Sequence, residues 1–332
     1  MKKVISIITV VVISVVAGVG GGCAGVEKPA DHVSVQLKWI HQAQFAGIYA
    51  ADQKGFYAEE NIDVTIKPGG IDIPPDKMIT DLVSGYTTFA IVGGDQVLID
   101  RSQDKPIVAI AVIFQRNPHV YVSLKRSGIK RPQDLVGKKV MVSDHGTIQH
   151  QALLKKLGID PETIELISYQ RDVTSLITGQ IDAHQVYRTG TGLEYDEAGY
   201  ELNLIWLDDY GIRLYADTIV ASEELVQQNP KLVERFLRAT LKGWRYAIEN
   251  PAEAVDMTLQ YDPKLGRDRQ VRMVEEQTPL IHTGKAEIGW MQDDVWQQMH
   301  QMLLDGGILT QPINVTEAYT MQFLNKIYGE AK

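Results

Sequence analysis

The sequence predicts an α/β protein whose two lobes close like a clamshell on a ligand held between them. Short apolar segments with period-two alternation are followed repeatedly by segments with helical spacing, the pattern of a sheet covered by helices. Polar and aromatic residues gather where several of these strands end, which is where open α/β sheets bind ligands. A second module is inserted into the first, so we expect one lobe from residues 33–118 plus 214–332 and the other from residues 119–213.

The N-terminal segment has the features of an export signal. Two lysines open it, an apolar run covers residues 4–19, and small residues precede Cys23. The run is shorter than the roughly 20 residues of a membrane-spanning helix. The position of Cys23 resembles the lipobox of bacterial lipoproteins, although Gly20 stands where leucine is usual. We expect a signal peptide over residues 1–22 and a lipid-anchored tether over residues 23–32; cleavage elsewhere, or an uncleaved anchor, is the alternative.

Composition narrows the class of partner. With 33 Lys and Arg against 42 Asp and Glu, the 332-residue chain has a formal net charge of -9, which argues against nucleic acid. The single cysteine excludes an intrachain disulfide and a four-cysteine metal site. His145 and His150 are five residues apart, a poor spacing for two ligands on one helix face, so we expect no metal site.

The stretch after the first strand is the strongest candidate for ligand contact. Alternation predicts a strand over residues 33–37, and helical spacing begins at Ala46. Aromatic rings and amides lie together between them, a combination that suits a flat heteroaromatic ligand. Because large apolar residues usually pack, Trp39 and Phe45 have a core role as their alternative. The candidate ligand-binding residues here are Trp39, Gln42, Gln44, Phe45 and Tyr49.

Two later strand ends add to the candidate site in the first lobe. We expect, in order, a strand over 62–66, a helix over 76–84, a strand over 88–92, a helix over 96–102 and a strand over 107–114. Two glycines and Asp95 follow the second of these strands, so Asp95 either contacts ligand or caps the next helix. The third strand ends in a polar cluster that includes Asn117.

The inserted module offers two more strand ends. We expect strands over 120–124, 138–142, 165–168 and 181–185, with a helix over 148–157 after the second. Asp144 and Thr147 lie in the turn before that helix, where free backbone N–H groups would bind a carbonyl, phosphate or carboxylate. The turn lacks the Gly-Lys-Ser/Thr ending of a P-loop. Tyr187 and Arg188 follow the last strand and suit a flat or anionic ligand, with an ordinary ion pair as the alternative for Arg188.

The C-terminal part is predicted to be helical and structural. Apolar residues recur at helical spacing after Asn229 and Pro230, the pattern of a helix with one face in the core. We expect the same packing role for Trp290 and Trp296.

Four segments together resemble a known family. They are LKWIHQAQFAGIYAADQKGFYAEENIDV, QDLVGKKVMVSDHGTIQH, LITGQIDAH and NPKLVERFLRATLKGWRYAIENPAEAV. In this order they are similar to the family that contains the thiamin-pyrimidine periplasmic binding proteins and the yeast pyrimidine synthase, over nearly the whole mature chain. The resemblance implies a type II periplasmic-binding-protein fold.

Within that family, the LKWxHQAQFAG form resembles the riboflavin-binding components of bacterial ABC importers. The resemblance implies a lipid-anchored, extracytoplasmic protein that captures riboflavin as cargo, holds no cofactor, and delivers its ligand to a membrane permease and its ATPase. A monomer is the simplest arrangement. By analogy with other clamps on flat rings, three aromatic residues would stack and four polar residues would read ring edges or a ribityl chain: Trp39, Phe45 and Tyr187, and Gln42, Gln44, Asn117 and Asp144.

Three alternatives remain open at this point. A binding protein for a thiamin pyrimidine precursor such as formylaminopyrimidine would share the fold. An enzyme like the yeast synthase is disfavoured, because Val92 and Gln96 align with its pyridoxal lysine and its sacrificial histidine, and its cysteine-rich iron motif is absent before Ile219. No Gly-x-Ser-x-Gly nucleophile elbow occurs either. A ligand sensor would need the same closing clamshell as a transporter component.

Overall fold

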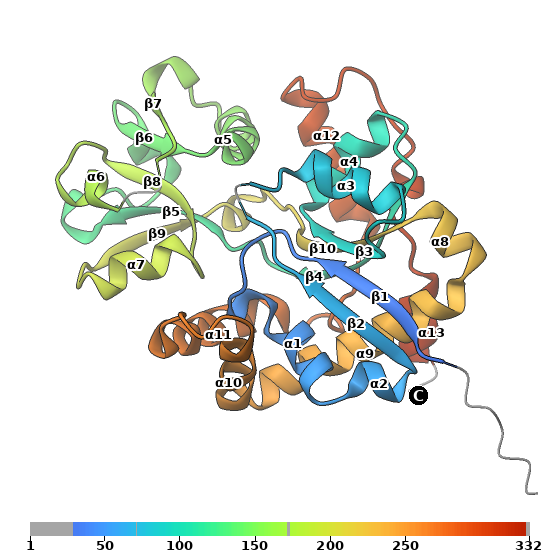
Figure 1. Cartoon of the computed structure of the whole chain (residues 1–332). Helices are drawn as coiled ribbons and strands as arrows, with labels where there is room; N and C mark the ends of the chain where they lie inside the picture. Colours follow the sequence, from blue (N-terminus) through green and yellow to red (C-terminus); the bar gives the residue numbers. More distant parts are fainter. Residues whose placement is uncertain (1–28, 71, 171–172, 330–332) are drawn as a thin grey trace, which may run out of the picture.

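Two five-stranded sheets, each with helices packed around it, form two lobes (Figure 1). The structure is a computed structural model that describes residues 29–70, 72–170 and 173–329. The expected signal peptide and Cys23 lie outside these residues. The prediction of a two-lobed α/β clamshell is confirmed.

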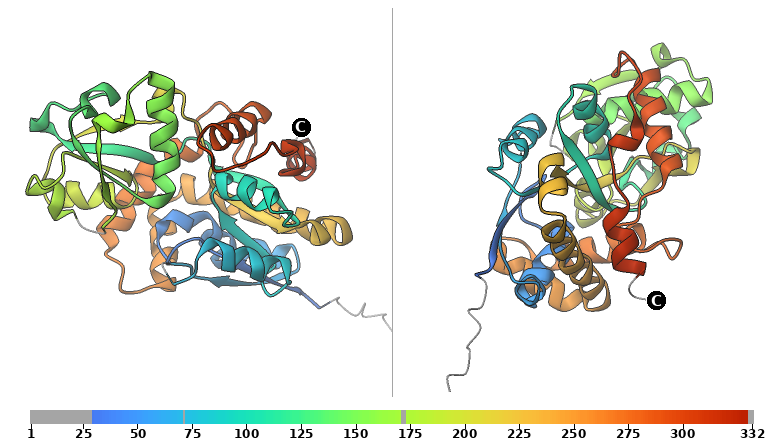
Figure 2. Two further views of the ribbon diagram at one scale, coloured as in Figure 1. Left: turned by 90° about the horizontal axis from the view of Figure 1, so that it is seen from above. Right: turned by 90° about the vertical axis from the view of Figure 1, so that its right-hand side faces the viewer.

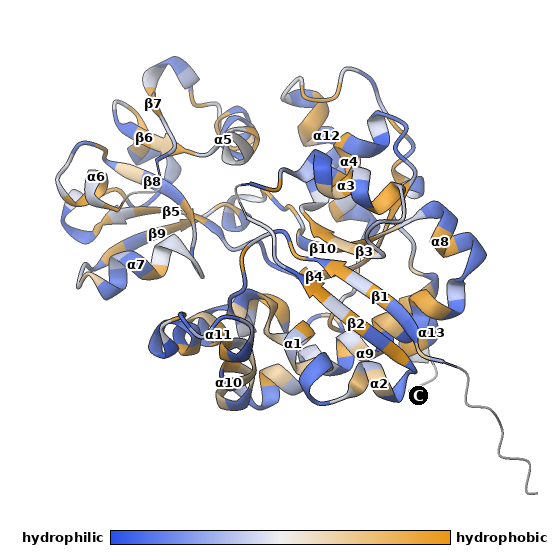
Figure 3. Ribbon diagram, in the orientation of Figure 1, coloured by the Kyte–Doolittle hydropathy of each residue, from blue (hydrophilic) through white to orange (hydrophobic). Residues whose placement is uncertain are grey.

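The first sheet has the strand order β2-β1-β3-β10-β4. Its strands are β1 (Asp31–Gln36), β2 (Ile62–Lys67), β3 (Phe89–Val92), β4 (Ile107–Phe114) and β10 (Ala216–Ser222). Strand β1 pairs in parallel with β2 and β3, whereas β10 runs antiparallel to β3 and β4. Every residue of β4 is buried, and Figure 3 shows hydrophobic residues gathered on β4 and β10. The carboxyl ends of β1, β3 and β4 therefore meet at one edge of this sheet.

The second sheet has the order β7-β6-β8-β5-β9 and is made entirely from the inserted part of the chain. Its strands are β5 (His119–Leu124), β6 (Lys139–Val142), β7 (Glu165–Ser168), β8 (Ala183–Tyr187) and β9 (Leu202–Trp206). The chain crosses between the sheets twice, over residues 115–118 and 207–215. Such paired crossings are the usual hinge of two-lobed binding proteins.

Helices of the first lobe cover its sheet. They are α1 (Ala46–Gln53), α2 (Phe56–Glu59), α3 (Pro75–Val83), α4 (Gly94–Ser102), α8 (Glu223–Gln228), α9 (Pro230–Glu249), α10 (Pro251–Tyr261), α11 (Arg267–Ile281), α12 (Asp293–Asp305) and α13 (Gln322–Gly329). As predicted, α9 turns its apolar face inward, and Phe236 stacks on Phe89 of β3 at 3.8 Å between ring centroids. Helix α1 packs directly on α9, since a Cβ added at Gly47 would lie 2.1 Å from the ring of Trp244.

The second lobe carries α5 (Asp144–Leu157), α6 (Thr174–Ile177) and α7 (Thr191–Glu197). Helix α5 begins four residues earlier than predicted, because Ser143 caps it by accepting a hydrogen bond from the N–H of Gly146 at 3.1 Å. The N–H of Thr147 therefore bonds to the carbonyl of Ser143 instead of facing a ligand. Helix α4 also starts early, at Gly94, so Asp95 lies in its first turn and is not its N-cap.

The two lobes touch on either side of the crossing segments. Helix α5 faces α12, where Lys155 pairs with Asp305 at 3.1 Å. On the other side α7 faces α11, and four ion pairs join the lobes: Arg188 with Glu276, Arg269 with Glu194 and with Glu197, and Arg272 with Asp196. Both ends of the described chain lie on the side of the first lobe that is remote from the second (Figures 1 and 2). A tether that precedes β1 therefore starts away from the contacts between the lobes.

Candidate ligand-binding cleft

A cavity of about 500 Å³ lies where the two lobes and the crossing segments meet. The first lobe contributes the loop after β1, the segment before α3 and the N-terminus of α4; the second contributes the start of β5, the end of β8 and the N-terminal half of α5. Asn117 and Tyr215 line it from the two crossings. Ligand contact here would touch both lobes at once, which is the geometry that couples binding to closure.

Aromatic side chains form much of the cavity wall. Trp39 follows β1 and is half-buried against the core, Tyr187 ends β8, and Tyr215 ends the second crossing. His119 meets the Tyr187 ring edge-on, with 4.4 Å between centroids, and its Nδ1 lies 3.1 Å from Oε1 of Gln149. Flat faces from both lobes are therefore available to a planar ligand.

Two predicted polar residues also line the cavity, with different amounts of free bonding capacity. The amide of Asn117 donates to the carbonyl of Leu214 at 3.1 Å and accepts from the N–H of His119 at 2.9 Å, so it ties the two crossings together. Asp95 has no hydrogen bond or ion pair within the described part of the chain. Its carboxylate is thus ready to accept a hydrogen bond from a ligand.

Lys38 is a cavity residue that the sequence analysis did not identify. Its ammonium lies 3.1 Å from Oδ1 of Asp217 on β10 and 3.1 Å from the hydroxyl of Tyr187 in the other lobe. Burial acts to lower the pKa of Lys38, but Tyr187 and Asp217 outweigh it and hold that pKa above its ordinary value. The pKa of the Tyr187 phenol is also above its ordinary value; here burial is the main cause of the rise, and the positive charge of Lys38 opposes it.

Four residues predicted near Trp39 do not line the cavity. After Trp39 the chain turns into a short 3₁₀ helix, η1 (Ala43–Phe45), which enters the first lobe. Gln270 and Gln277 of α11 hold the N–H and the carbonyl of Ala43, each at 2.7 Å. This anchoring turns the following side chains toward the protein interior.

The interior contacts of those side chains are specific. Gln42 donates to Gln44 at 2.7 Å, and Gln44 donates to Oδ2 of Asp217 at 2.8 Å. Phe45 is buried in the core, which is the packing role given above as its alternative to ligand contact. Tyr49 is also buried, with its hydroxyl 3.0 Å from Nδ1 of His41 and its ring stacked on that of Tyr261.

Of the remaining predicted residues, Arg188 and Thr147 point elsewhere. Arg188 bonds Asp196 and Glu276, each at 2.7 Å, which is the ion-pair alternative. Burial acts to lower the pKa of Arg188, and the bonds to these two carboxylates outweigh that effect and raise it. Thr147 donates its hydroxyl to the carbonyl of Ser143. The side chain of Asp144 lies outside the described residues, although its neighbour Ser143 lines the cavity.

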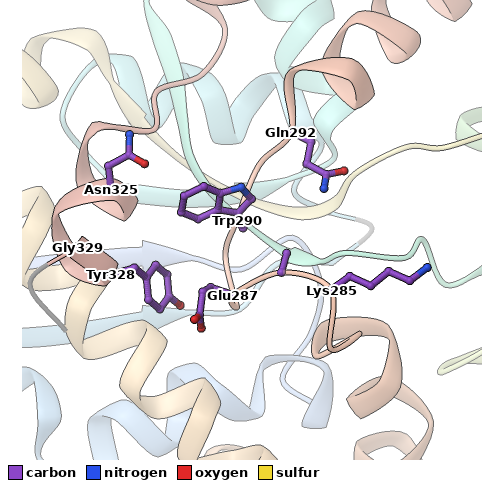
Figure 4. A pocket seen from close by; sticks show the side chains of 8 residues that line it. Lys285, Glu287, Trp290, Gln292, Asn325, Tyr328 and Gly329 are labelled. Carbon is purple, nitrogen blue, oxygen red and sulfur yellow. The ribbon is translucent and has the colours of Figure 1, made fainter. Parts of the chain in front are cut away.

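A second cavity of about 390 Å³ lies on the first lobe alone, between the segment joining α11 to α12 and helix α13 (Figure 4). Trp290 and Tyr328 line it, and the Tyr328 hydroxyl donates to the carbonyl of Ile288 at 2.5 Å. None of the described residues of the second lobe lines it, so a ligand there would not bridge the lobes. The cleft cavity is therefore the better candidate site.

The described residues show neither a metal-binding cluster nor a membrane-spanning helix. Residues 29–70, 72–170 and 173–329 hold no group of three or more His, Cys, Asp or Glu side chains arranged for a metal ion. Within these ranges no helix combines the length and apolar character needed to cross a bilayer.

Relatives that carry different names match most of the chain. Riboflavin-binding protein RibY of Chloroflexus aurantiacus is 27% identical over 307 residues, covering 89% of this chain and 86% of its own. The formylaminopyrimidine-binding protein of Halalkalibacterium halodurans is 26% identical, with coverages of 89% and 91%. A 4-amino-5-hydroxymethyl-2-methylpyrimidine phosphate synthase of Legionella pneumophila is also 26% identical, with coverages of 89% and 92%.

Solved structures agree on the fold. A putative periplasmic sulfonate-binding protein, SsuA of Methylobacillus flagellatus, superposes with a TM-score of 0.71 at 15% identity, covering 92% of this chain and 96% of its own. The chain thus has a periplasmic-binding-protein fold. The model of the NMT1/THI5 like family matches residues 42–254, which is more than half of the sequence. This match, together with the relatives that span nearly the whole chain, shows that the protein belongs to the NMT1/THI5 like family.

Proposed function

We propose that this protein is the substrate-binding component of an ABC importer and that it captures riboflavin in the cleft. The observation that carries the proposal is the cavity itself, which is built by both lobes and walled by aromatic rings. Its volume of about 500 Å³ falls within the roughly 300–1,000 Å³ of pockets that hold one small organic molecule. The relative named as a riboflavin-binding protein supports this ligand.

Binding without chemistry is supported by the residues at two cavity positions. Val92 and Gln96, which align with the pyridoxal lysine and the sacrificial histidine of the yeast synthase, both line the cavity. An alkyl group and an amide supply neither an amine for a Schiff base nor an imidazole to be consumed. At these two positions the chain therefore lacks the reactive groups that the synthase chemistry would need.

The fit of a flavin follows from the arrangement of flat and polar surfaces. The tricyclic ring would lie against Trp39 and Tyr187, one from each lobe, and its binding would bury aromatic area in both. Asp95 would accept from a ring N–H or a ribityl hydroxyl. Closure around the ring would then present a two-lobed surface to a permease.

The cellular setting of the proposal comes from the N-terminal sequence. An export signal over residues 1–22 and lipidation of Cys23 would place the mature protein at the outer face of the cell membrane, tethered to it as a monomer. Mass spectrometry of the protein purified from membranes tests this part, with a diacylated or triacylated N-terminal Cys23 as the expected result. A mature N-terminus elsewhere would refute lipid anchoring and leave the ligand proposal standing.

Formylaminopyrimidine is a second candidate ligand, because the Asp95 carboxylate, which no described residue pairs with, suits the exocyclic amine of an aminopyrimidine as well. The relative named for that ligand covers as much of this chain as the riboflavin-binding relative does. The smaller pyrimidine would leave more of the cavity of about 500 Å³ to water, whereas riboflavin would bury more apolar ring area against its aromatic wall, which favours riboflavin.

A fluorescence titration separates the candidates. Riboflavin, formylaminopyrimidine and thiamin are each titrated into the mature protein. The same titrations are run on Trp39→Ala and Trp290→Ala, which replace a matched pair of half-buried tryptophans. We expect riboflavin emission to be quenched to saturation at one equivalent, with at least tenfold weaker binding in Trp39→Ala and unchanged binding in Trp290→Ala. Saturable binding of the pyrimidine without a flavin response would identify the ligand as a thiamin pyrimidine precursor in place of riboflavin.

A further inference from the structure

Lys38 is held in place by two partners that belong to different parts of the molecule. It lies two residues after the end of β1, and its ammonium is 3.1 Å from Asp217 of the first lobe and 3.1 Å from the Tyr187 hydroxyl of the second. Its side chain is 25% exposed, whereas that of Asp217 is 2% exposed. Lys38 is therefore partly exposed to the cavity, while the carboxylate that pairs with it is buried.

The carboxylate beneath Lys38 is itself fixed. Oδ2 of Asp217 accepts from the amide of Gln44 at 2.8 Å, which leaves Oδ1 for the ammonium. The backbone of Asp217 has φ of 52°, a left-handed conformation that is uncommon for residues other than glycine. Such local strain persists where the surroundings hold it, and it concentrates at functional sites.

The ammonium keeps one donor for a ligand. A lysine ammonium has three N–H groups; the Tyr187 hydroxyl accepts a hydrogen bond from one of them, and the ion pair with Asp217 engages a second. The third has no partner among the described residues, and Lys38 lines the cavity next to Trp39. An aromatic wall and a fixed cationic donor thus lie side by side.

Charge decides which kind of acceptor the donor suits. Lys38 is neutralised by Asp217, and Asp95 is the other Lys, Arg, Asp or Glu side chain on the described cavity wall. The unpaired charge in the cavity is therefore negative, so an anionic ligand would be repelled. A neutral ring that carries a carbonyl oxygen satisfies Lys38 without bringing a second negative charge.

We propose that Lys38 is a specificity-determining residue whose ammonium donates a hydrogen bond to a carbonyl oxygen on the ring edge or ring substituent of the ligand. This inference rests on the proposed function and adds a residue-level reason for ligand choice. Because Tyr187 of the other lobe shares the ammonium, the carbonyl contact forms at the point where the lobes are joined. A ligand without this carbonyl would leave a cationic donor unsatisfied on closure.

The test couples a change in the protein to a change in the ligand. Riboflavin, 2-thioriboflavin and 4-thioriboflavin are titrated into native protein and a Lys38→Met variant, since sulfur accepts hydrogen bonds weakly. We expect Lys38→Met to bind riboflavin roughly 10- to 100-fold more weakly. One thio analogue should bind native protein about tenfold more weakly than riboflavin, yet bind Lys38→Met within about twofold of riboflavin.

Two further variants keep the test decisive. Lys242→Met, at an exposed ion pair with Glu59, is the matched control and should bind riboflavin as native protein does. If Lys38→Met fails to fold because Asp217 loses its partner, the Lys38→Met/Asp217→Asn pair replaces it, since asparagine keeps an acceptor for Gln44. Equal losses on thio substitution in native and Lys38 variants, for both analogues, would overturn the inference while the riboflavin proposal stands.

The same comparison, in which ligand and protein are changed together, can be made with the pyrimidine ligand. If native protein binds formylaminopyrimidine and not riboflavin, that ligand is compared with its deformylated amine, which lacks the carbonyl. A preference for the formyl compound that disappears in Lys38→Met supports the inference even though the riboflavin proposal has failed. A preference that is unchanged in Lys38→Met, or binding of neither ligand class by native protein, overturns it.

Discussion

Replacing Asp217 should separate the energy of its ion pair from that of its backbone strain. In Asp217→Ala, Gln44 loses its buried acceptor, a hydrogen bond to a charged group worth about 1.5–3 kcal/mol, and Lys38 loses the carboxylate of its ion pair. Lys38 is partly exposed and recovers water, so its share lies at the lower end. Removal of the buried charge offsets part of the loss. We expect the free energy of unfolding to fall by about 3 kcal/mol.

Two companion variants fix the interpretation of that number. Asparagine tolerates a left-handed φ and still accepts from Gln44, so Asp217→Asn should lose only about half as much stability as the alanine variant. Asp217→Gly should be roughly 0.5–1 kcal/mol more stable than Asp217→Ala, because glycine relieves about 1–2 kcal/mol of strain and gives back part of it as backbone entropy.

The assay is urea unfolding followed by tryptophan fluorescence, with midpoint shifts converted through a common slope. An alanine variant within about 0.5 kcal/mol of native stability would refute the reasoning about the buried cluster. An asparagine variant as unstable as the alanine variant would refute the role given to Gln44. A glycine variant less stable than alanine would refute the role given to backbone strain.

Three more predictions follow from packing, titration and contacts between the lobes. Burial lowers the pKa of His150 to about 4, below the value of about 6.5 expected in the unfolded chain. The free energy of unfolding should therefore be highest above about pH 6.5 and fall by about 1.4 kcal/mol for each pH unit between about pH 6.5 and about pH 4; urea unfolding curves of His150→Gln should lack this pH dependence. Gly47→Ala should destabilise the protein by at least about 2 kcal/mol in thermal melts. Gly266→Ala, with no atom within 4 Å of the added Cβ, should cost no more than about 1 kcal/mol, the loss of a favourable residue at the N-cap of α11. Glu276→Gln removes the carboxylate that pairs with Arg188 between the lobes, so it should weaken riboflavin binding by up to about tenfold and make the affinity less dependent on salt than in native protein. Unchanged affinity would contradict a role for this ion pair in closing the lobes.

Local pattern predicted the framework because the framework is local. Period-two alternation identified β1, and helical spacing identified α9 and the burial of Phe236 and Trp244. Trp39 and Tyr187 were placed at strand ends, and strand ends of both sheets do line the cavity. These features depend on residues a few positions apart, which one sequence displays directly.

The site details depend on partners far away in the chain. Gln44 turned inward because Asp217 accepts its amide from 173 positions later, and Ala43 is held by Gln270 from 227 positions later. Lys38 was not among the candidate residues, although a lysine directly before Trp39 was a visible signal. Pairing across such distances is fixed by tertiary packing, which local propensity does not encode.

A crystal structure of the mature protein with riboflavin tests the central claim most directly. The account predicts the flavin ring in the cleft between the lobes, against Trp39 and Tyr187, with a ring carbonyl about 2.7–3.2 Å from the ammonium of Lys38. Riboflavin bound in the cavity beside Trp290, or a cleft without flavin at saturating ligand, would contradict it.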